Sequence, residues 1–264
     1  MIFTGMRNGK HYQNQTGDIR RGVGMALFSY KTGVWPISLE IAGARLSLNQ
    51  DGSVQLQVGA TEIGQGADTV FSQMAAETLH MDISRVHIVT QQDTDVTPFD
   101  TGAYASRQSF VTGTAVKECA QQLKQKILEY ARTLVPGNVD RLELEDGYIL
   151  ADGKPAISLE DLAMESYYSL SNSSVLTAEV SRQVKKNTVA SGCCFAEVEV
   201  DMKLGKIKVL DIVNVHDSGT LLNPQLAAMQ VHGGMFMGIG YGVSEQLLID
   251  EKTGRPLNGD FAGL

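Results

Sequence analysis

Residues 59–69, Gly-Ala-Thr-Glu-Ile-Gly-Gln-Gly-Ala-Asp-Thr, have the types and spacing of a ligand-binding turn. Gln65 stands between two glycines, which let a ligand approach the backbone closely. Its amide can donate and accept hydrogen bonds without adding charge. The alternating residues 54–58 predict a strand before the turn, and residues 69–79 predict a helix after it. Because the start of such a helix offers free N–H groups to an anion, the pattern indicates a cradle for a phosphate-bearing organic cofactor.

A simple strand-to-helix turn would explain the same residues, and the sequence alone leaves that alternative open. Two familiar nucleotide-binding motifs are excluded. Thr69 occupies the place of the third glycine of the dinucleotide-binding fingerprint, and no Lys-Ser/Thr pair follows as in a P-loop.

Two further loops share this composition of Gly, Ala, Ser and Thr, at residues 101–107 and 216–224. Each ends where a helix is predicted to begin. Neither pairs a nucleophile with a base, and neither has the spacing of metal ligands. The chain is therefore expected to hold a ligand through amides and hydroxyls, and the ligand is expected to carry the chemistry.

The composition narrows the class of protein. The chain of 264 residues has a formal net charge of −8, and an acidic chain without a basic cluster argues against nucleic acid as a partner. Its three cysteines form neither an even set nor a Cys-x-x-Cys pattern, which is typical of reduced thiols in a cytoplasmic protein. The N-terminus lacks the pattern of a signal peptide. We expect a cytoplasmic protein with no membrane partner.

The order of elements predicts an α+β fold made of two related units of mixed sheet with packed helices. A hairpin, a glycine turn and a helix occur near 38–80 and again near 190–243. Further helices are predicted at 108–134 and 159–168, and a strand at 240–250. The expected domains are an N-terminal lead-in at 1–36, a first α+β cofactor-binding unit at 37–140, a bridging segment at 141–188, and a second α+β unit at 189–264 that is truncated at its C-terminal end.

Five segments form a specific set, at residues 21–26, 59–66, 100–107, 217–224 and 230–234. Together they resemble the molybdenum-cofactor-binding subunit of bacterial xanthine dehydrogenases, within the xanthine oxidase family of molybdenum hydroxylases. The resemblance extends from residue 20 to about residue 250 and covers the C-terminal portion of such a subunit. It implies the paired α+β cofactor-binding fold.

The resemblance also implies roles for individual residues. Gln65 and Ala105 would lie near molybdenum without being direct protein ligands of the metal. The other expected cofactor contacts are neighbours of these two residues and one glutamine on the last predicted helix. The full set of expected cofactor-binding residues is Gly64, Gln65, Gly66, Ala105, Ser106 and Gln230. Met229 departs from the family, which often has glycine before the second glutamine.

The activity implied is the hydroxylation of purines with water-derived oxygen. The implied cofactor is molybdenum–molybdopterin in its cytosine dinucleotide form, with iron–sulfur clusters and FAD on partner subunits. The catalytic glutamate of the family lies beyond Leu264, so no catalytic residue is expected within this fragment and the isolated chain is expected to be inactive. The remainder of its own subunit is a further expected partner, and a homodimer of the complex is left open.

Three other functions remain open at this point. The chain could be a non-catalytic cofactor-binding module, or part of an aldehyde-oxidising member of the same family. It could also be an interaction domain in which the glycine loops serve only as turns.

Overall fold

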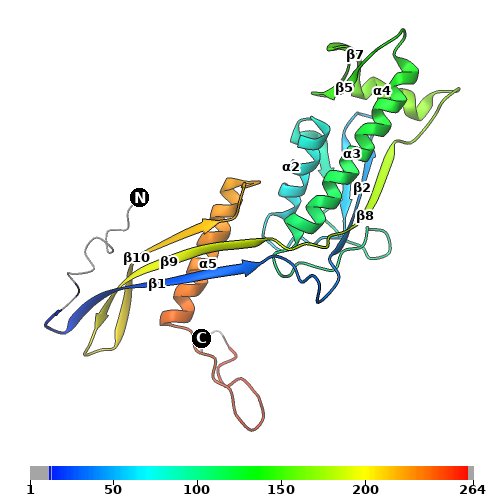
Figure 1. The fold of residues 1–264 in the computed structure, drawn as a ribbon. Helices are drawn as coiled ribbons and strands as arrows, with labels where there is room; N and C mark the ends of the chain where they lie inside the picture. Colours follow the sequence, from blue (N-terminus) through cyan, green and yellow to red (C-terminus); the bar gives the residue numbers. More distant parts are fainter. Residues whose placement is uncertain (1–11, 13, 261–264) are drawn as a thin grey trace. The chain divides into compact units, whose positions relative to one another are not determined.

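The computed structural model describes residues 12 and 14–260, which form two compact units (Figure 1). Among the described residues, unit 1 combines those up to Tyr30 with those from Val189 to Asp260, and unit 2 is formed by Lys31–Thr188. Each unit joins sheet to helix, which confirms the predicted α+β class.

The main sheet of unit 2 has four strands in the order β4-β3-β2-β8. Strands β2 (Ile41–Leu48) and β3 (Val54–Val58) form the predicted hairpin, with Leu48 paired to Val54. Strand β4 (Val86–Ile88) runs parallel to β3. Strand β8 (Thr177–Gln183) pairs antiparallel with the other edge of β2. The segment expected to bridge the units therefore supplies an edge strand of this sheet.

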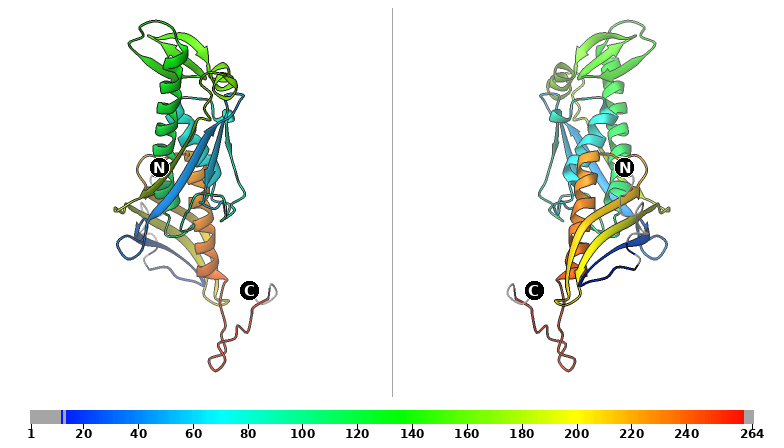
Figure 2. Two further views of the ribbon diagram at one scale, coloured as in Figure 1. Left: turned by 90° about the vertical axis from the view of Figure 1, so that its right-hand side faces the viewer. Right: turned by 90° about the vertical axis from the view of Figure 1, so that its left-hand side faces the viewer.

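Two helices pack on this sheet and form the core of unit 2, as the views in Figure 2 show. They are α2 (Ala67–Leu79) and α3 (Gln108–Leu134), and the bounds of α3 are those predicted. The buried residues of α3 recur at helical spacing, which explains why a mostly polar sequence forms one continuous helix against the sheet. They include Val111, Ala115, Cys119, Leu123, Ile127 and Ala131.

A small meander follows α3 in unit 2. Its strands are β5 (Leu142–Glu145), β6 (Tyr148–Ala151) and β7 (Lys154–Ser158), in that order. The helix α4 (Leu159–Tyr168) begins directly after it with the predicted bounds. The hydroxyl of Ser158 accepts a hydrogen bond from the Asp161 amide at 3.0 Å, which caps the first turn.

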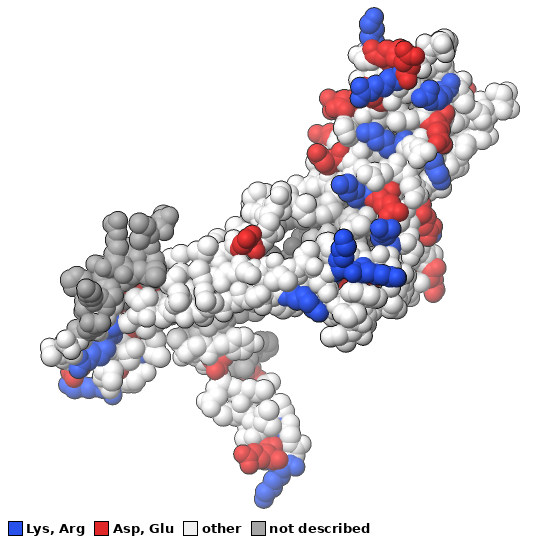
Figure 3. All heavy atoms as spheres, viewed as in Figure 1, with Lys and Arg blue, Asp and Glu red and all other residues white. Residues whose placement is uncertain are grey.

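Acidic and basic side chains are interspersed on the face of unit 2 visible in Figure 3. Ion pairs such as Arg45–Glu179, at 2.8 Å, join side chains of opposite sign across neighbouring strands. This face is therefore mixed in sign.

Unit 1 contains a three-stranded sheet in the order β1-β9-β10. Its strands are β1 (Ile19–Lys31), β9 (Val189–Asp201) and β10 (Lys206–Asp217), and β9 and β10 form the second predicted hairpin. Because β1 pairs with β9, the expected lead-in at 1–36 supplies a strand to this unit. Cys193 and Cys194 are adjacent on β9 and are both free thiols.

The helix α5 (Pro224–Val243) follows β10 and begins at Asn223, whose side chain accepts a hydrogen bond from the Leu226 amide at 3.0 Å. The predicted strand at 240–250 is wrong. The helix continues to Val243, and within 244–250 the structure has one isolated bridge, between Ile249 and Pro256. The apolar residues of this segment resemble a strand in sequence, but no strand of the described chain lies beside them to form a ladder. None of the helices described has the length and apolar character needed to cross a membrane.

Candidate functional site

The glycine turn lies between β3 and α2, where the sequence placed it. Gly64 has φ 97° and Gly66 has φ 86°, both in the left-handed region that favours glycine. Gly66 is also the residue that precedes the first turn of α2. The two glycines therefore bring successive backbone N–H groups toward the same side of the turn.

The carboxylate of Glu62 occupies the concave side of this turn. Its Oε1 accepts hydrogen bonds from the amides of Gly64 at 2.7 Å and Gly66 at 3.0 Å, and its Oε2 accepts one from Asp68 at 3.1 Å. Burial raises the pKa of Glu62, but these backbone donors outweigh burial and hold the pKa below its ordinary value. The expectation that the start of α2 offers free N–H groups to an external anion is wrong, because the protein's own anion takes them.

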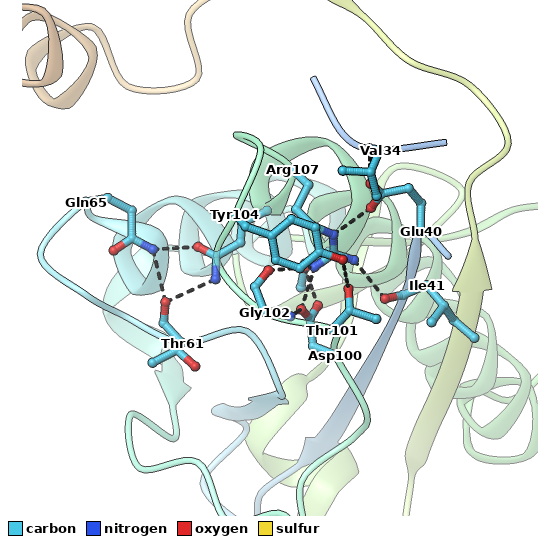
Figure 4. A network of polar contacts seen from close by, with 12 residues as sticks. Val34, Glu40, Ile41, Thr61, Gln65, Asp100, Thr101, Gly102, Tyr104 and Arg107 are labelled. Atoms are coloured by element: carbon cyan, nitrogen blue, oxygen red, sulfur yellow. Dashed lines mark hydrogen bonds and ion pairs between the residues drawn. The ribbon is translucent and has the colours of Figure 1, made fainter. Parts of the chain in front are cut away.

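The side chain of Gln65 is held within the protein. Its Oε1 accepts from the Ile63 amide at 2.7 Å, and its Nε2 donates to the Thr61 carbonyl at 3.0 Å, as Figure 4 shows for Thr61. The same Nε2 donates to Oε1 of Gln108 at 2.5 Å. Both donors of the Gln65 amide are therefore engaged, and Oε1 keeps one acceptor position.

Gln108 is a site residue that the sequence analysis missed. It is the first residue of α3 and is 8% exposed. Its Nε2 also donates to the Thr61 carbonyl, at 3.1 Å. Gln108 thus joins the glycine turn to the segment 100–107, and its position directly after that segment was the available signal.

Ala105 and Ser106 form a backbone corner near the end of that segment, just before α3. Their φ angles are 48° and 52°, a conformation that costs a residue with a Cβ roughly 1–2 kcal/mol. The carbonyl of Ala105 accepts a hydrogen bond from the Gly33 amide at 2.8 Å, which helps to hold the corner. No side chain caps the start of α3. The Arg107 amide donates to the Tyr104 carbonyl at 3.2 Å and the Phe110 amide to the Arg107 carbonyl at 3.1 Å, so backbone carbonyls satisfy part of this helix start.

A buried charge network holds the segment 100–107 in place (Figure 4). The side chain of Arg107 is fully buried, and its Nε donates to Glu40 at 2.6 Å while its Nη1 donates to Asp100 at 2.5 Å. Further guanidinium bonds reach the carbonyls of Gly102, at 3.0 Å, and Ile41, at 2.8 Å. Burial lowers the pKa of Arg107, but the two carboxylates outweigh burial and raise it above its ordinary value. Arg107 is thus a permanently charged anchor.

The network also fixes the loop around this anchor. Asp100 accepts hydrogen bonds from the Gly102 amide at 2.8 Å and from the Thr112 hydroxyl at 2.7 Å. The Tyr104 ring lies 5.5 Å from the Arg107 guanidinium carbon, and its hydroxyl is 3.0 Å from that of Thr101. Several hydrogen bonds and ion pairs therefore hold the loop that leads to the corner at Ala105.

The predicted site residues divide between the two units. Gly64, Gln65, Gly66, Ala105 and Ser106 all belong to unit 2, where Gln108 connects the two loops. Gln230 lies on α5 in unit 1 and is exposed. In the part of the chain that the structure describes, no group of three or more His, Cys, Asp and Glu residues could hold a metal ion.

Comparison with known proteins gives one family and a consistent set of relatives. A family model described as a molybdopterin cofactor-binding domain matches residues 3–263. The chain is 49% identical over 256 residues to the xanthine dehydrogenase molybdenum-binding subunit of Escherichia coli O157:H7, covering 96% of this chain and 34% of that protein. It is 27% identical over 248 residues to the aldehyde oxidoreductase molybdenum-binding subunit PaoC of Escherichia coli strain K12, covering 94% of this chain and 32% of that protein.

Among solved structures, the Cu,Mo-CO dehydrogenase matches with a TM-score of 0.80 and 24% identity. The match covers 98% of this chain and 33% of that one, and it shows that the fold is shared. The chain thus spans about a third of the length of these relatives.

Proposed function

The chain belongs to the molybdopterin cofactor-binding domain family, and we propose that it is the cofactor-holding part of a xanthine dehydrogenase-like molybdenum hydroxylase subunit. The observation that carries this proposal is the 49% identity to a xanthine dehydrogenase molybdenum-binding subunit along 96% of the chain. The proposed reaction of the complete enzyme is the hydroxylation of a purine with oxygen from water.

The residues of unit 2 fit such a cofactor. Molybdenum in this family is held by the dithiolene of the pterin, which suits a site of amides and small side chains. Gly64 and Gly66 keep the backbone free of side chains at the turn, and a Cβ at Gly64 would meet open space. Ala105 and Ser106 present small side chains at a corner fixed by Arg107. This fit supports the assignment of these residues to cofactor binding.

Each part of the site has a distinct role in the proposal. When bound, the cofactor supplies the oxygen transfer and accepts two electrons from the substrate. Gln65 contacts the cofactor with a neutral amide, and Gln108 sets the orientation of that amide. The start of α3 offers backbone donors to the phosphate end, since Glu62 already occupies the start of α2. Gln230 on α5 contributes a hydrogen bond to the pterin.

The partners extend the same proposal. The cytosine dinucleotide form of the cofactor, the iron–sulfur and FAD subunits, a cytoplasmic location and the remainder of the subunit are all proposed for the complete protein. In this arrangement the iron–sulfur and FAD subunits would supply the route by which electrons leave the cofactor. The subunit descriptions of the matched relatives support an assembly of several chains.

Oxidation of an aldehyde is the second candidate function. It is favoured by the match to an aldehyde oxidoreductase molybdenum-binding subunit along 94% of the chain, although the identity is only 27%. Because both candidates use the same cofactor, only the substrate distinguishes them.

The test is to purify the complete protein with its partner subunits and to measure molybdenum, pterin and turnover. We expect stoichiometric molybdenum and pterin, and turnover of xanthine well above that of an aromatic aldehyde. The opposite preference would favour the second candidate. Absence of both molybdenum and pterin would contradict the function and favour an interaction domain.

A further inference from the structure

The Glu62 side chain is unusual in where its hydrogen bonds go. A glutamate in an exposed loop is ordinarily solvated, yet this carboxylate accepts three backbone N–H groups at 2.7, 3.0 and 3.1 Å. The donors come from Gly64, Gly66 and Asp68, so the bonds cross the whole turn and enter the first turn of α2. The arrangement is that of a bound anion, except that the anion belongs to the chain.

The geometry of the turn depends on this carboxylate. Gly64 and Gly66 both have left-handed φ angles, which direct their amides toward the concave side of the turn. Without an acceptor there, each of these N–H groups would lose a hydrogen bond, which costs free energy. One carboxylate satisfies them together, because Oε1 takes two donors and Oε2 takes the third. An aspartate has the same charge, but its chain is one methylene shorter and could not span the same donors.

The same contacts determine what the turn presents outward. Because the Glu62 carboxylate already accepts these N–H groups, its negative charge would repel a second anion near the start of α2 at short range, where screening by water is incomplete. The group that the turn can present is the remaining acceptor position of the neutral Gln65 Oε1, whose other position accepts from the Ile63 amide.

We propose that Glu62 is a positioning residue for the cofactor turn, acting as a built-in anion. It shapes the Gly64–Gly66 backbone before any cofactor binds, and it directs the neutral Gln65 amide, rather than the start of α2, toward the cofactor. The link to the cofactor rests on the proposed function, whereas the shaping of the turn does not.

The experiment compares the complete protein with Glu62→Ala, Glu62→Asp and Glu77→Ala variants by hydrogen exchange. Glu77 is an exposed glutamate on the same helix and serves as the matched control. In Glu62→Ala we expect exchange of the amides within 64–68 to rise about tenfold, as the loss of bonds to a charged acceptor predicts. Glu62→Asp should lie between the wild type and Glu62→Ala, and Glu77→Ala should match the wild type in this segment.

Chemical rescue makes the test specific to an anion. The empty amides of Glu62→Ala should bind acetate, so added sodium acetate should restore protection within 64–68. Acetamide, which has the same shape without the charge, should not. Exchange equal to wild type in Glu62→Ala, or equal rescue by acetamide, would overturn the built-in anion.

Molybdenum and pterin content, measured on the same samples, tests the link to the cofactor. We expect Glu62→Ala to retain less of both than Glu77→Ala. If exchange rises while cofactor content is unchanged, the positioning role is overturned. If the wild-type protein itself contains neither molybdenum nor pterin, the proposed function fails, and the exchange data still decide whether Glu62 shapes the turn.

Discussion

Nε2 of Gln65 donates to Oε1 of Gln108 at 2.5 Å, although the two residues are 43 positions apart in sequence. The pair joins the turn before α2 to the first residue of α3. Because the Thr61 carbonyl accepts from both amides, the three groups form a closed set. The orientation of Gln65 is therefore decided by α3 as well as by its own turn.

Gln65→Glu should be more damaging than Gln65→Ala in the complete enzyme. A carboxylate at this position would face two acceptors, the Thr61 carbonyl and Oε1 of Gln108, in place of the donor they now share. We expect Gln65→Ala to keep most of the molybdenum and to lower turnover roughly tenfold, as for residues that orient a metal site. Gln65→Glu should lower both quantities further. Gln55→Glu adds the same charge at an exposed position of β3 and is the control. Wild-type molybdenum content and turnover in both Gln65 variants would mean that Gln65 is only a turn residue.

Gly66→Val should abolish cofactor retention for two reasons: the backbone conformation at this position is strained for valine, and the added side chain would obstruct the approach of the cofactor to the turn. A β-branched residue at φ 86° is strained by roughly 1–3 kcal/mol. Gly137→Val is the matched control, since Gly137 has φ 90° in an exposed loop after α3 and a Cβ there would meet open space. Both variants should lose similar stability in thermal unfolding, but only Gly66→Val should lose molybdenum. Equal loss of metal in the two variants would indicate a general folding defect instead.

Arg107→Lys should destabilise unit 2 strongly despite conserving the charge. A lysine cannot reach Glu40, Asp100 and the two backbone carbonyls at once, so buried acceptors would lose their donors. We expect a loss of about 3 kcal/mol in the free energy of unfolding, measured by urea titration. The control is Arg45→Lys, because Arg45 pairs with Glu179 at the surface and exposed pairs contribute about 1 kcal/mol or less. Similar midpoints for the two variants would contradict the anchoring role of Arg107.

Asp68→Asn should stabilise the protein at neutral pH. Burial raises the pKa of Asp68, with the charge of Glu62 as a second cause, and its Oδ1 is buried without a hydrogen-bond partner. A raised folded pKa means that ionisation is more costly in the folded state, so this cost is present above the folded pKa and absent below the unfolded value near 3.8. The melting temperature of Asp68→Asn should exceed that of wild type at pH 7, and the difference should disappear as the pH falls below that value. A lower melting temperature at pH 7 would show that the Asp68 charge is stabilising.

Glu62→Gln should change the melting temperature at pH 7 in the opposite direction to Asp68→Asn. The folded pKa of Glu62 is lowered, so its contribution to stability is present above the unfolded value of 4.5 and is lost as the pH falls through the folded pKa. The variant should therefore melt below wild type at pH 7, and the two curves should converge in acid. A constant difference at every pH would assign the effect to packing instead of charge.

The sequence by itself determined the features that depend on neighbouring residues. The first hairpin, the bounds of α3 and the bounds of α4 follow from the local periodicity of the residues. The glycine turn was predicted for the same reason, since left-handed φ angles at 64 and 66 require residues that the sequence displays directly.

Only the tertiary structure decided which distant segments meet. Strand β8 pairs with β2 at the edge of the sheet, and Gln108 accepts a hydrogen bond from Gln65. Arg107 donates to Glu40, which is 67 residues away in sequence. The same reason explains the failed strand at 240–250, because an apolar run becomes a strand only where another strand accepts its hydrogen bonds. The direction of the Glu62 side chain could not be predicted from the sequence either, because a glutamate can be solvated as readily as it can accept backbone N–H groups. The folded backbone of the turn places three donors beside it, and these fix its direction.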